Sequence, residues 1–305
     1  MQLTPIVILG LVIPACALTS ETAELESAVS ELGGTSCTAT KVEPGVFSTS
    51  ADEGRLVFSL NGRDAYFHRV IPGLGERLFE SHRTSGAWST PVEVPFSSGF
   101  VEFDPFISLD GNTLYYVSFR PVPGAVLPRG DGDLWKVERT AHGWGTPSYL
   151  TDVNTEANEF FPSLTADGTL YFNSDRPGGP GAWDIYTARR RGAGFHAPQP
   201  LRGSVNSSIW EFNPSPSPLG ALLAFASLDP DPAAPYSDVF FAARTGAGYS
   251  ERVDAGPCVN TLDEEYHPTL DIARNRLIFV RRDPFDPTFN GDFYQVPLVG
   301  SLWSH

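Results

Sequence analysis

The segment EFDPFISLDGNTLYYVSFRP, residues 102–121, contains the pattern that decides the fold. Asp110-Gly111 separates two runs rich in aromatic and β-branched residues, which predicts a β-hairpin because glycine supplies the positive φ of a tight turn. The pattern recurs in EFFPSLTADGTLYFNSDRP (159–177) and EFNPSPSPLGALLAFASLDP (211–230). More divergent copies are EYHPTLDIARNRLIFVRRDP (265–284) and EGRLVFSLNGRDAYFHRV (53–70). The chain therefore contains five copies of one unit.

Further landmarks keep the same spacing as the hairpins. Each copy opens on a glutamate, and successive glutamates are 49, 57, 52 and 54 residues apart. An acidic residue before an aromatic strand recurs at Asp133, Asp184, Asp238 and Asp292, and an aromatic residue follows each one eleven positions later. A fixed period of this length indicates a repeat architecture. Each copy predicts four antiparallel strands, the fourth being a short outer strand such as residues 146–150, where Pro147 is tolerated at an edge.

Five such sheets, apolar on both faces, bury those faces only by packing radially against one another, which predicts an all-β, five-bladed β-propeller. The Pro105-x-x-Ser108-x-Asp110-Gly111 strand pair and the Asp184-Ile185-Tyr186 strand resemble the repeats of TolB-type propellers, WD40-like proteins with PD40 repeats from the bacterial cell envelope. The resemblance covers residues 38–305 and implies the fold. TolB itself has six blades and an additional N-terminal α/β domain, so its partners do not carry over to a chain with five copies.

The last copy lacks a fourth strand, because His305 follows the aromatic Trp303 by only two residues. Residues 38–52 have the length of the corresponding segment in the second copy, and they directly precede the first glutamate. We therefore expect the N-terminal strand to complete the fifth blade and close the ring, which removes an open sheet edge.

The first residues are expected to direct export. Residues 4–18, TPIVILGLVIPACAL, form an uncharged apolar run that is too short to span a membrane and is typical of a signal peptide. Ile13-Pro14-Ala15-Cys16 resembles a lipobox with Cys16 as the lipidated residue, whereas Ala15-Cys16-Ala17 also fits an ordinary signal-peptidase site. We favour a lipoprotein of the periplasm or outer membrane, with a signal peptide (1–16), a polar linker (17–37) and the propeller domain (38–305).

The sequence has three cysteines, and Cys16 belongs to the targeting segment. The remaining pair, Cys37 and Cys258, has the even parity that allows a disulfide in an exported protein. The repeat register argues against that bridge, because it places Cys37 and Cys258 at opposite ends of a strand while bridged Cα atoms lie within about 7 Å.

Antiparallel order places all the opening glutamates on one face of the ring, together with the long loops 119–132, 228–237 and 283–291. Two interpretations stay open: each glutamate accepts hydrogen bonds in a repeated structural role, or the glutamates form a carboxylate cluster that binds a cation or a basic group of a partner. The candidate binding residues on this face are Glu53, Glu102, Asp104, Glu159, Glu211, Glu265, His267, Arg120, Arg176 and Arg282.

Charge and motif content exclude several classes of function. The formal net charge of −15 repels a phosphate backbone and excludes nucleic-acid binding. Neither metal-ligand spacing nor a catalytic or cofactor-binding motif occurs, so no cofactor and no metal are expected. The leading hypothesis is a non-catalytic, monomeric binding or scaffold propeller that presents its loop-rich face to a protein, a peptide or an envelope glycan. The alternative is a glycoside hydrolase on a five-bladed propeller, which needs two converging carboxylates.

Overall fold

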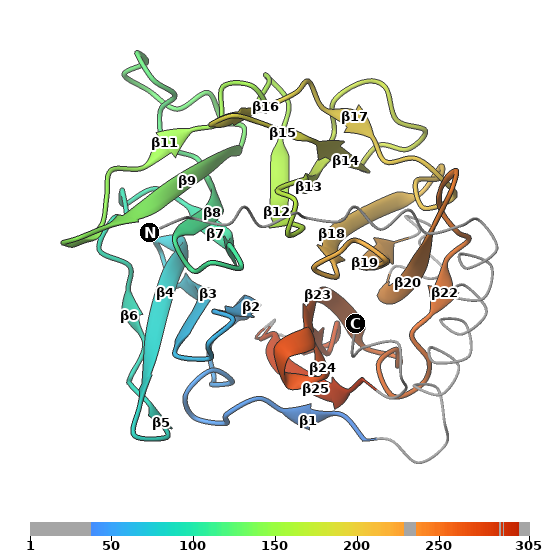
Figure 1. The fold of residues 1–305 in the computed structure, drawn as a ribbon. Coiled ribbons are helices and arrows are strands. Elements are labelled where there is room, and N and C mark those ends of the chain that lie inside the picture. The colour runs from blue at the N-terminus through green and yellow to red at the C-terminus, as the bar shows by residue number, and fades with distance from the viewer. Residues whose placement is uncertain (1–37, 229–235, 287, 289, 299–305) are drawn as a thin grey trace, which may run out of the picture.

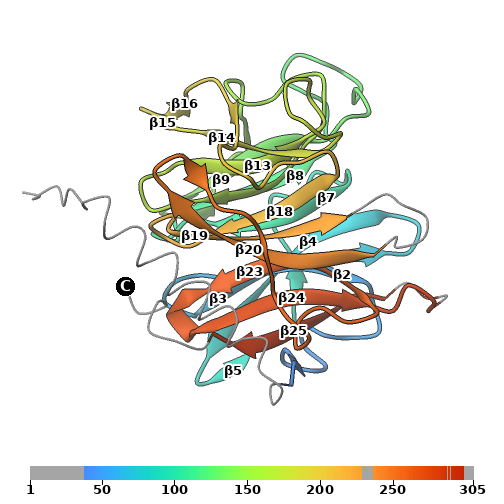
Figure 2. The same ribbon diagram turned by 90° about the vertical axis from the view of Figure 1, so that its right-hand side faces the viewer.

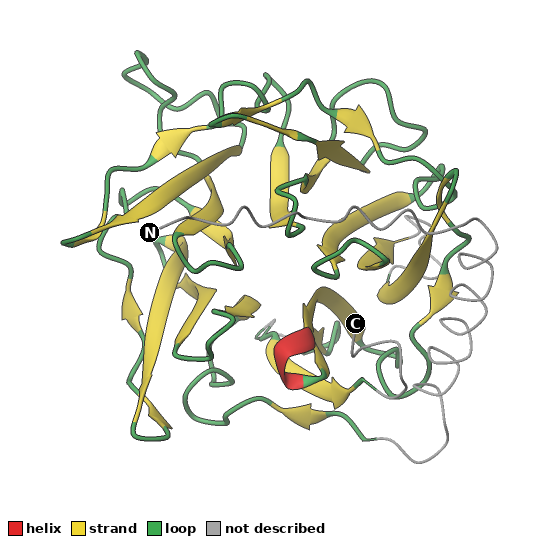
Figure 3. Cartoon of the chain, in the orientation of Figure 1, coloured by secondary structure: helices red, strands yellow, loops and turns green. Residues whose placement is uncertain are grey.

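A computed structural model describes residues 38–228, 236–286, 288 and 290–298, and they form a five-bladed β-propeller (Figure 1). The predicted signal peptide (1–16), the linker (17–37) and Trp303 lie outside these residues. The described part of the chain consists of strands and loops, with one short 3-10 helix, η1 (Ile272–Arg274) (Figure 3). Among the described residues, no helix is long and apolar enough to cross a membrane.

Each predicted copy folds into one antiparallel blade whose first strand is innermost. Blade 1 contains β2 (Glu53–Phe58), β3 (Asp64–Ile71), β4 (Gly75–Thr84), β5 (Ala87–Trp88) and β6 (Val92–Glu93). Blade 2 contains β7 (Glu102–Ile107), β8 (Thr113–Ser118), β9 (Asp133–Thr140), β10 (Gly143–Trp144) and β11 (Ser148–Tyr149). Blade 3 contains β12 (Glu159–Leu164), β13 (Leu170–Ser174), β14 (Asp184–Ala188) and β17 (Gln199–Pro200), with the small hairpin β15 (Arg190–Arg191) and β16 (Gly194–Phe195).

Blade 4 contains β18 (Trp210–Pro216), β19 (Leu222–Leu228), β20 (Ser237–Thr245), β21 (Gly248–Tyr249) and β22 (Val253–Asp254). Blade 5 contains β23 (Glu264–Asp271), β24 (Arg276–Arg282), β25 (Asp292–Pro297) and, from the other end of the chain, β1 (Thr40–Lys41). In β1 the Cα partners are Thr40 with Gln295 and Lys41 with Tyr294, so the predicted closure of the ring by the N-terminal strand is confirmed.

The core is divided among the five contacts between neighbouring blades. Between blades 5 and 1, for example, Phe47 packs with Phe67 and Phe293, and the closing segment also buries Val42. Four further clusters of buried side chains fill the remaining blade contacts in the same way. Each blade therefore buries both of its faces against its neighbours, as the apolar strands of the repeat predict.

The hairpin turns form as the sequence predicts. Gly62, Gly111 and Gly168 have φ values of 70°, 72° and 80°, the conformation that glycine adopts at no steric cost. Blade 5 replaces this turn by η1, which ends at Asn275 with φ 50°. These hairpins lie on one face of the ring, and the long loops after β8 and β24 project from the other (Figure 2).

Cys258 lies on the loop after blade 4 and is disulfide-bonded to a partner outside the described residues. The repeat register argues only against a bridge between Cys258 and Cys37, and because Cys37 lies outside the described residues that expectation stays a prediction. The register constrains only residues that lie within a strand, and β1 begins at Thr40, after both of the other cysteines.

Candidate functional site

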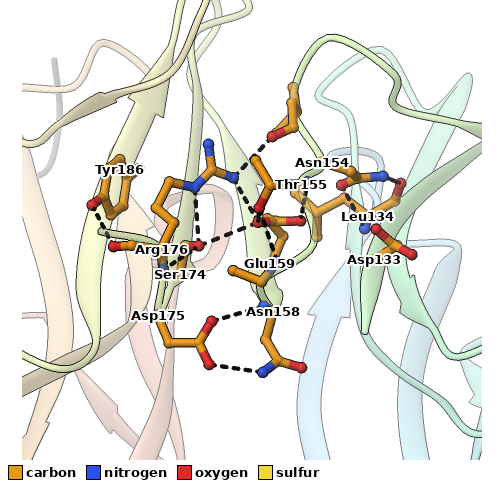
Figure 4. A network of polar contacts seen from close by, with 12 residues as sticks. Asp133, Leu134, Asn154, Thr155, Asn158, Glu159, Ser174, Asp175, Arg176 and Tyr186 are labelled. Atoms are coloured by element: carbon orange, nitrogen blue, oxygen red, sulfur yellow. Dashed lines mark hydrogen bonds and ion pairs between the residues drawn. The ribbon is translucent and has the colours of Figure 1, made fainter. Parts of the chain in front are cut away.

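The five opening glutamates are buried and carry the same hydrogen bonds in every blade. Glu159 is 0% exposed and accepts hydrogen bonds from the Thr155 amide at 2.9 Å and the Thr155 hydroxyl at 2.6 Å (Figure 4). The residue four positions earlier is always Ser or Thr: Thr49, Ser98, Thr155, Ser207 and Thr261 each bond the glutamate of their own copy. The glutamate therefore fixes the loop that leads into its blade.

An arginine from the second strand of the blade, or from the loop directly after it, completes this arrangement. Arg176 Nη2 donates to Glu159 Oε1 at 2.8 Å, Arg281 Nε donates to Glu265 at 2.7 Å, and Arg120 pairs with Glu102. Burial raises the pKa of Glu159, although Thr155 and Arg176 act in the opposite direction. Arg120 and Arg176 are thus bonded within their own blades, and Arg282 pairs with Glu264 while its neighbour Arg281 takes the repeated position.

An asparagine one residue before the Ser or Thr anchors the same loop to the preceding blade. Asn154 accepts a hydrogen bond from the Leu134 amide at 3.0 Å and donates to the Leu134 carbonyl at 2.9 Å (Figure 4). Asn206 and Asn260 bond Ile185 and Val239 in the same way. The glutamates therefore bond within their own copies and form no shared carboxylate cluster.

A different set of side chains meets on the axis of the ring. Two positions after each glutamate the innermost strand contains a β-bulge, and the residue there has a left-handed conformation. The φ values lie between 47° and 57°, and the residues are Arg55, Asp104, Phe161, Asn213 and His267. A residue other than glycine rarely adopts positive φ, so five such residues in register are a repeated strained feature of the innermost strands.

Contacts between blades that are not neighbours show that these side chains reach the axis. His267 Nε2 of blade 5 lies 3.1 Å from Asp104 Oδ1 of blade 2. Arg55 of blade 1 donates to the Pro162 carbonyl of blade 3 at 3.0 Å, and the rings of Phe161 and His267 lie 5.5 Å apart. The structure thus brings together Asp104 and His267, two of the residues that the sequence selected.

His68 on β3 joins this axial cluster. Its Nδ1 accepts a hydrogen bond from the Asp104 amide at 3.2 Å and lies 3.7 Å from Asp104 Oδ1. Gly54 makes room for the imidazole, since a Cβ at this position would lie 2.1 Å from His68 Nε2. His68, Asp104 and His267 each offer one ligand atom, and the three atoms lie within 4.8 Å of one another.

The axial polar groups are buried and only partly hydrogen-bonded. Neither carboxylate oxygen of Asp104 has a hydrogen-bond partner of good geometry, and Nδ1 of His267, Nδ2 of Asn213, and Nε and Nη1 of Arg55 also lack one among the described residues. Burial raises the pKa of Asp104 to about 6, lowers the pKa of His68 to about 3 and lowers that of His267 well below its usual value. Both imidazoles are therefore neutral at pH 7.

Sequence reasoning missed His68 and Arg55. Arg55 could have been found by aligning the five copies on their glutamates, which places Arg55, Asp104, Phe161, Asn213 and His267 in one column of unlike residues. No comparable signal marks His68, because its contact with Asp104 forms only when neighbouring blades pack.

Two cavities lie on the hairpin side of the ring. One of about 760 Å³ lies between blades 3 and 4, and Asp167 is the one carboxylate in its lining. The other, of about 80 Å³, is lined by Arg55 and by one carboxylate, Asp271. Asp167 accepts a hydrogen bond from Thr165 at 2.5 Å, and Asp271 is bonded to Arg274 and Arg276. Neither cavity contains the carboxylate pair that glycoside hydrolysis requires.

Comparison with known proteins supports the fold. No protein-family model and no curated protein matches the chain. It is similar to the solved structure of an α-L-arabinofuranosidase from Lactobacillus brevis, at 11% identity and a TM-score of 0.56, over 84% of this chain and 92% of that one. An endo-arabinase from Bacteroides thetaiotaomicron gives 12% identity and a TM-score of 0.53, over 84% of this chain and 98% of that one.

A putative TolB from Agrobacterium tumefaciens is similar at 20% identity with a TM-score of 0.48, over 68% of this chain and 67% of that one. At these identities a likeness establishes the fold and not the activity. The chain is a five-bladed β-propeller whose structural neighbours include glycoside hydrolases.

Proposed function

We propose that this protein is a non-catalytic, exported binding module that presents its loop-rich face to a protein partner. The observation that carries this proposal is the placement of exposed apolar side chains. Nine large hydrophobic residues in the described part of the chain are exposed, and six belong to loops of that face, with exposures from 37% to 89%: Leu74, Phe100, Val126, Leu127, Leu262 and Phe285.

The opposite face differs in this respect. Only Leu60 and Leu219 among the exposed large hydrophobic residues lie in its hairpin turns, and Val92 lies on the outer strand β6. Burial of exposed apolar side chains contributes favourable free energy to protein association, so a face that carries six of them is suited to a protein partner. A protein partner is therefore favoured over an envelope glycan on this face.

The glycosidase alternative receives less support from the geometry. A retaining or inverting enzyme needs two carboxyl groups about 5 to 9.5 Å apart that reach the sugar. The five repeated glutamates are buried and hydrogen-bonded. Asp104 is the one acid among the five bulge residues and is itself 0% exposed.

The Cys16 lipid anchor and the periplasmic or outer-membrane location remain part of the proposal.

The test compares the two faces. We expect Val126→Ser together with Leu127→Ser, and Phe285→Ser separately, to abolish in vivo cross-linking to a specific envelope protein while leaving the melting temperature unchanged. Leu60→Ser with Leu219→Ser is the matched control on the hairpin face and should retain the cross-link. Equal cross-linking by all variants would contradict the proposal, as would hydrolysis of aryl arabinosides by the purified wild type.

A further inference from the structure

We propose that His68, Asp104 and His267 bind a divalent transition-metal ion of the zinc type on the axis of the propeller. This inference does not depend on the protein-binding face, because the axial cluster lies inside the ring and uses none of the exposed loop residues. It rests on the donor set, on the distances between donors and on the carboxylate oxygens of Asp104, which have no hydrogen bond of good geometry among the described residues.

The distances between donor atoms fit one ion. Two ligands bound at about 2.1 Å in a tetrahedral site lie about 3.4 Å from each other. The two separations that involve Asp104 Oδ1 lie on either side of this value, at 3.1 Å to His267 Nε2 and 3.7 Å to His68 Nδ1. All three donor atoms lie within 4.8 Å of one another, so binding one ion requires them to move closer together.

The burial of the donors also fits a bound ion. His68 and His267 are each 7% exposed and Asp104 is 0% exposed. Asp104 is fully buried, and neither carboxylate oxygen has a hydrogen bond of good geometry among the described residues. The Phe161 amide and Arg55 stabilise its charge, and a bound cation would stabilise it further. Two nitrogen donors and one oxygen donor favour zinc and its neighbours in the first transition row over Ca²⁺, which prefers oxygen ligands only.

Two features lower the expected affinity. The Nδ1 atom of His68 accepts the Asp104 amide, so metal binding must replace a buried hydrogen bond. Arg55 is buried nearby and its charge opposes a second cation. Three protein donors leave the fourth position of a tetrahedral site to a water molecule or another small ligand. We therefore expect weaker binding than at a structural zinc site.

The experiment uses the full-length protein carrying an affinity tag without histidines. After treatment with a chelator and its removal, Zn²⁺ and Co²⁺ are titrated by calorimetry, and the visible spectrum of bound Co²⁺ reports nitrogen ligation. We expect one ion per chain and a higher melting temperature with Zn²⁺, because a ligand that binds only the folded state stabilises it. Asp104→Asn and His267→Gln should each weaken binding by at least about tenfold.

The control is His82→Gln. The exposed His82 lies 2.8 Å from Asp64 and 3.8 Å from Glu80, a surface group of the same residue types, and its loss should leave binding unchanged. The proposal is wrong if the wild type binds no Zn²⁺ or Co²⁺ stoichiometrically, if Ca²⁺ binds in preference, or if His82→Gln abolishes binding while Asp104→Asn retains it. The melting-temperature response of the wild type decides the question even if an axial variant fails to fold.

Discussion

Two rings of residues lie two positions apart in the same five strands, and they differ in almost every respect. The glutamate ring has the same residue in every blade, and each side chain is hydrogen-bonded by a Ser or Thr of its own copy. The axial bulge ring has five different residues in one backbone conformation, with polar atoms left unpaired. The residue that is the same in all five copies has a structural role, whereas the bulge position, where the five residues differ, brings unlike side chains together on the axis.

The largest expected effect on stability tests the structural role of the glutamate ring. Glu159→Ala should lower the free energy of unfolding by about 3 to 5 kcal/mol, because it leaves the largely buried Arg176 without its carboxylate. Glu211→Ala should cost less, since Arg252 lies 3.8 Å from Glu211 and its side chain is 36% exposed, so water can solvate it. Urea unfolding of both variants measures the difference, and equal losses would contradict this account of the arginine.

A smaller loss of stability is expected at Gly54, the residue that leaves space for the His68 ring. Gly54→Ala should lower the free energy of unfolding by about 1 to 3 kcal/mol, because the added methyl group would overlap the His68 ring and displace it. Gly246→Ala is the matched control, since a Cβ at Gly246 meets no atom within 4 Å. Thermal melts of the two proteins check this prediction, and a neutral Gly54→Ala would mean that His68 does not occupy this position.

The smallest effect distinguishes the two rings most sharply. Asp104→Asn, measured by urea unfolding at pH 7 in the presence of a chelator, should change the free energy of unfolding by less than about 1 kcal/mol. The amide keeps the shape of the side chain and removes a buried charge whose oxygens have no hydrogen bond of good geometry. This gain offsets the loss of a nearby negative charge for the buried Arg55, with which Asp104 makes no hydrogen bond among the described residues. A loss as large as that of Glu159→Ala would show that Asp104 is a structural residue like the glutamates.

Much of the site around each glutamate could be predicted from sequence. The copies align on Glu53, Glu102, Glu159, Glu211 and Glu265, and the same alignment contains Ser or Thr four positions earlier. The interpretation as a repeated structural role follows from that regularity. The sequence did not predict that Arg281, and not Arg282, bonds Glu265. Adjacent residues of a strand point to opposite faces, so only the strand register determines which of the two arginines faces the glutamate.

The sequence by itself determined the propeller, its five blades, the hairpin turns and the closure by β1, because these follow from local strand and turn patterns repeated at a constant spacing. Only the tertiary structure decided the axial cluster. His68, Asp104 and His267 are separated by 36 and 163 residues and come from three blades, and no local pattern records which side chains meet when five sheets converge. The closed ring brings them together, because the innermost strands leave one narrow axis where five bulge residues must share the space.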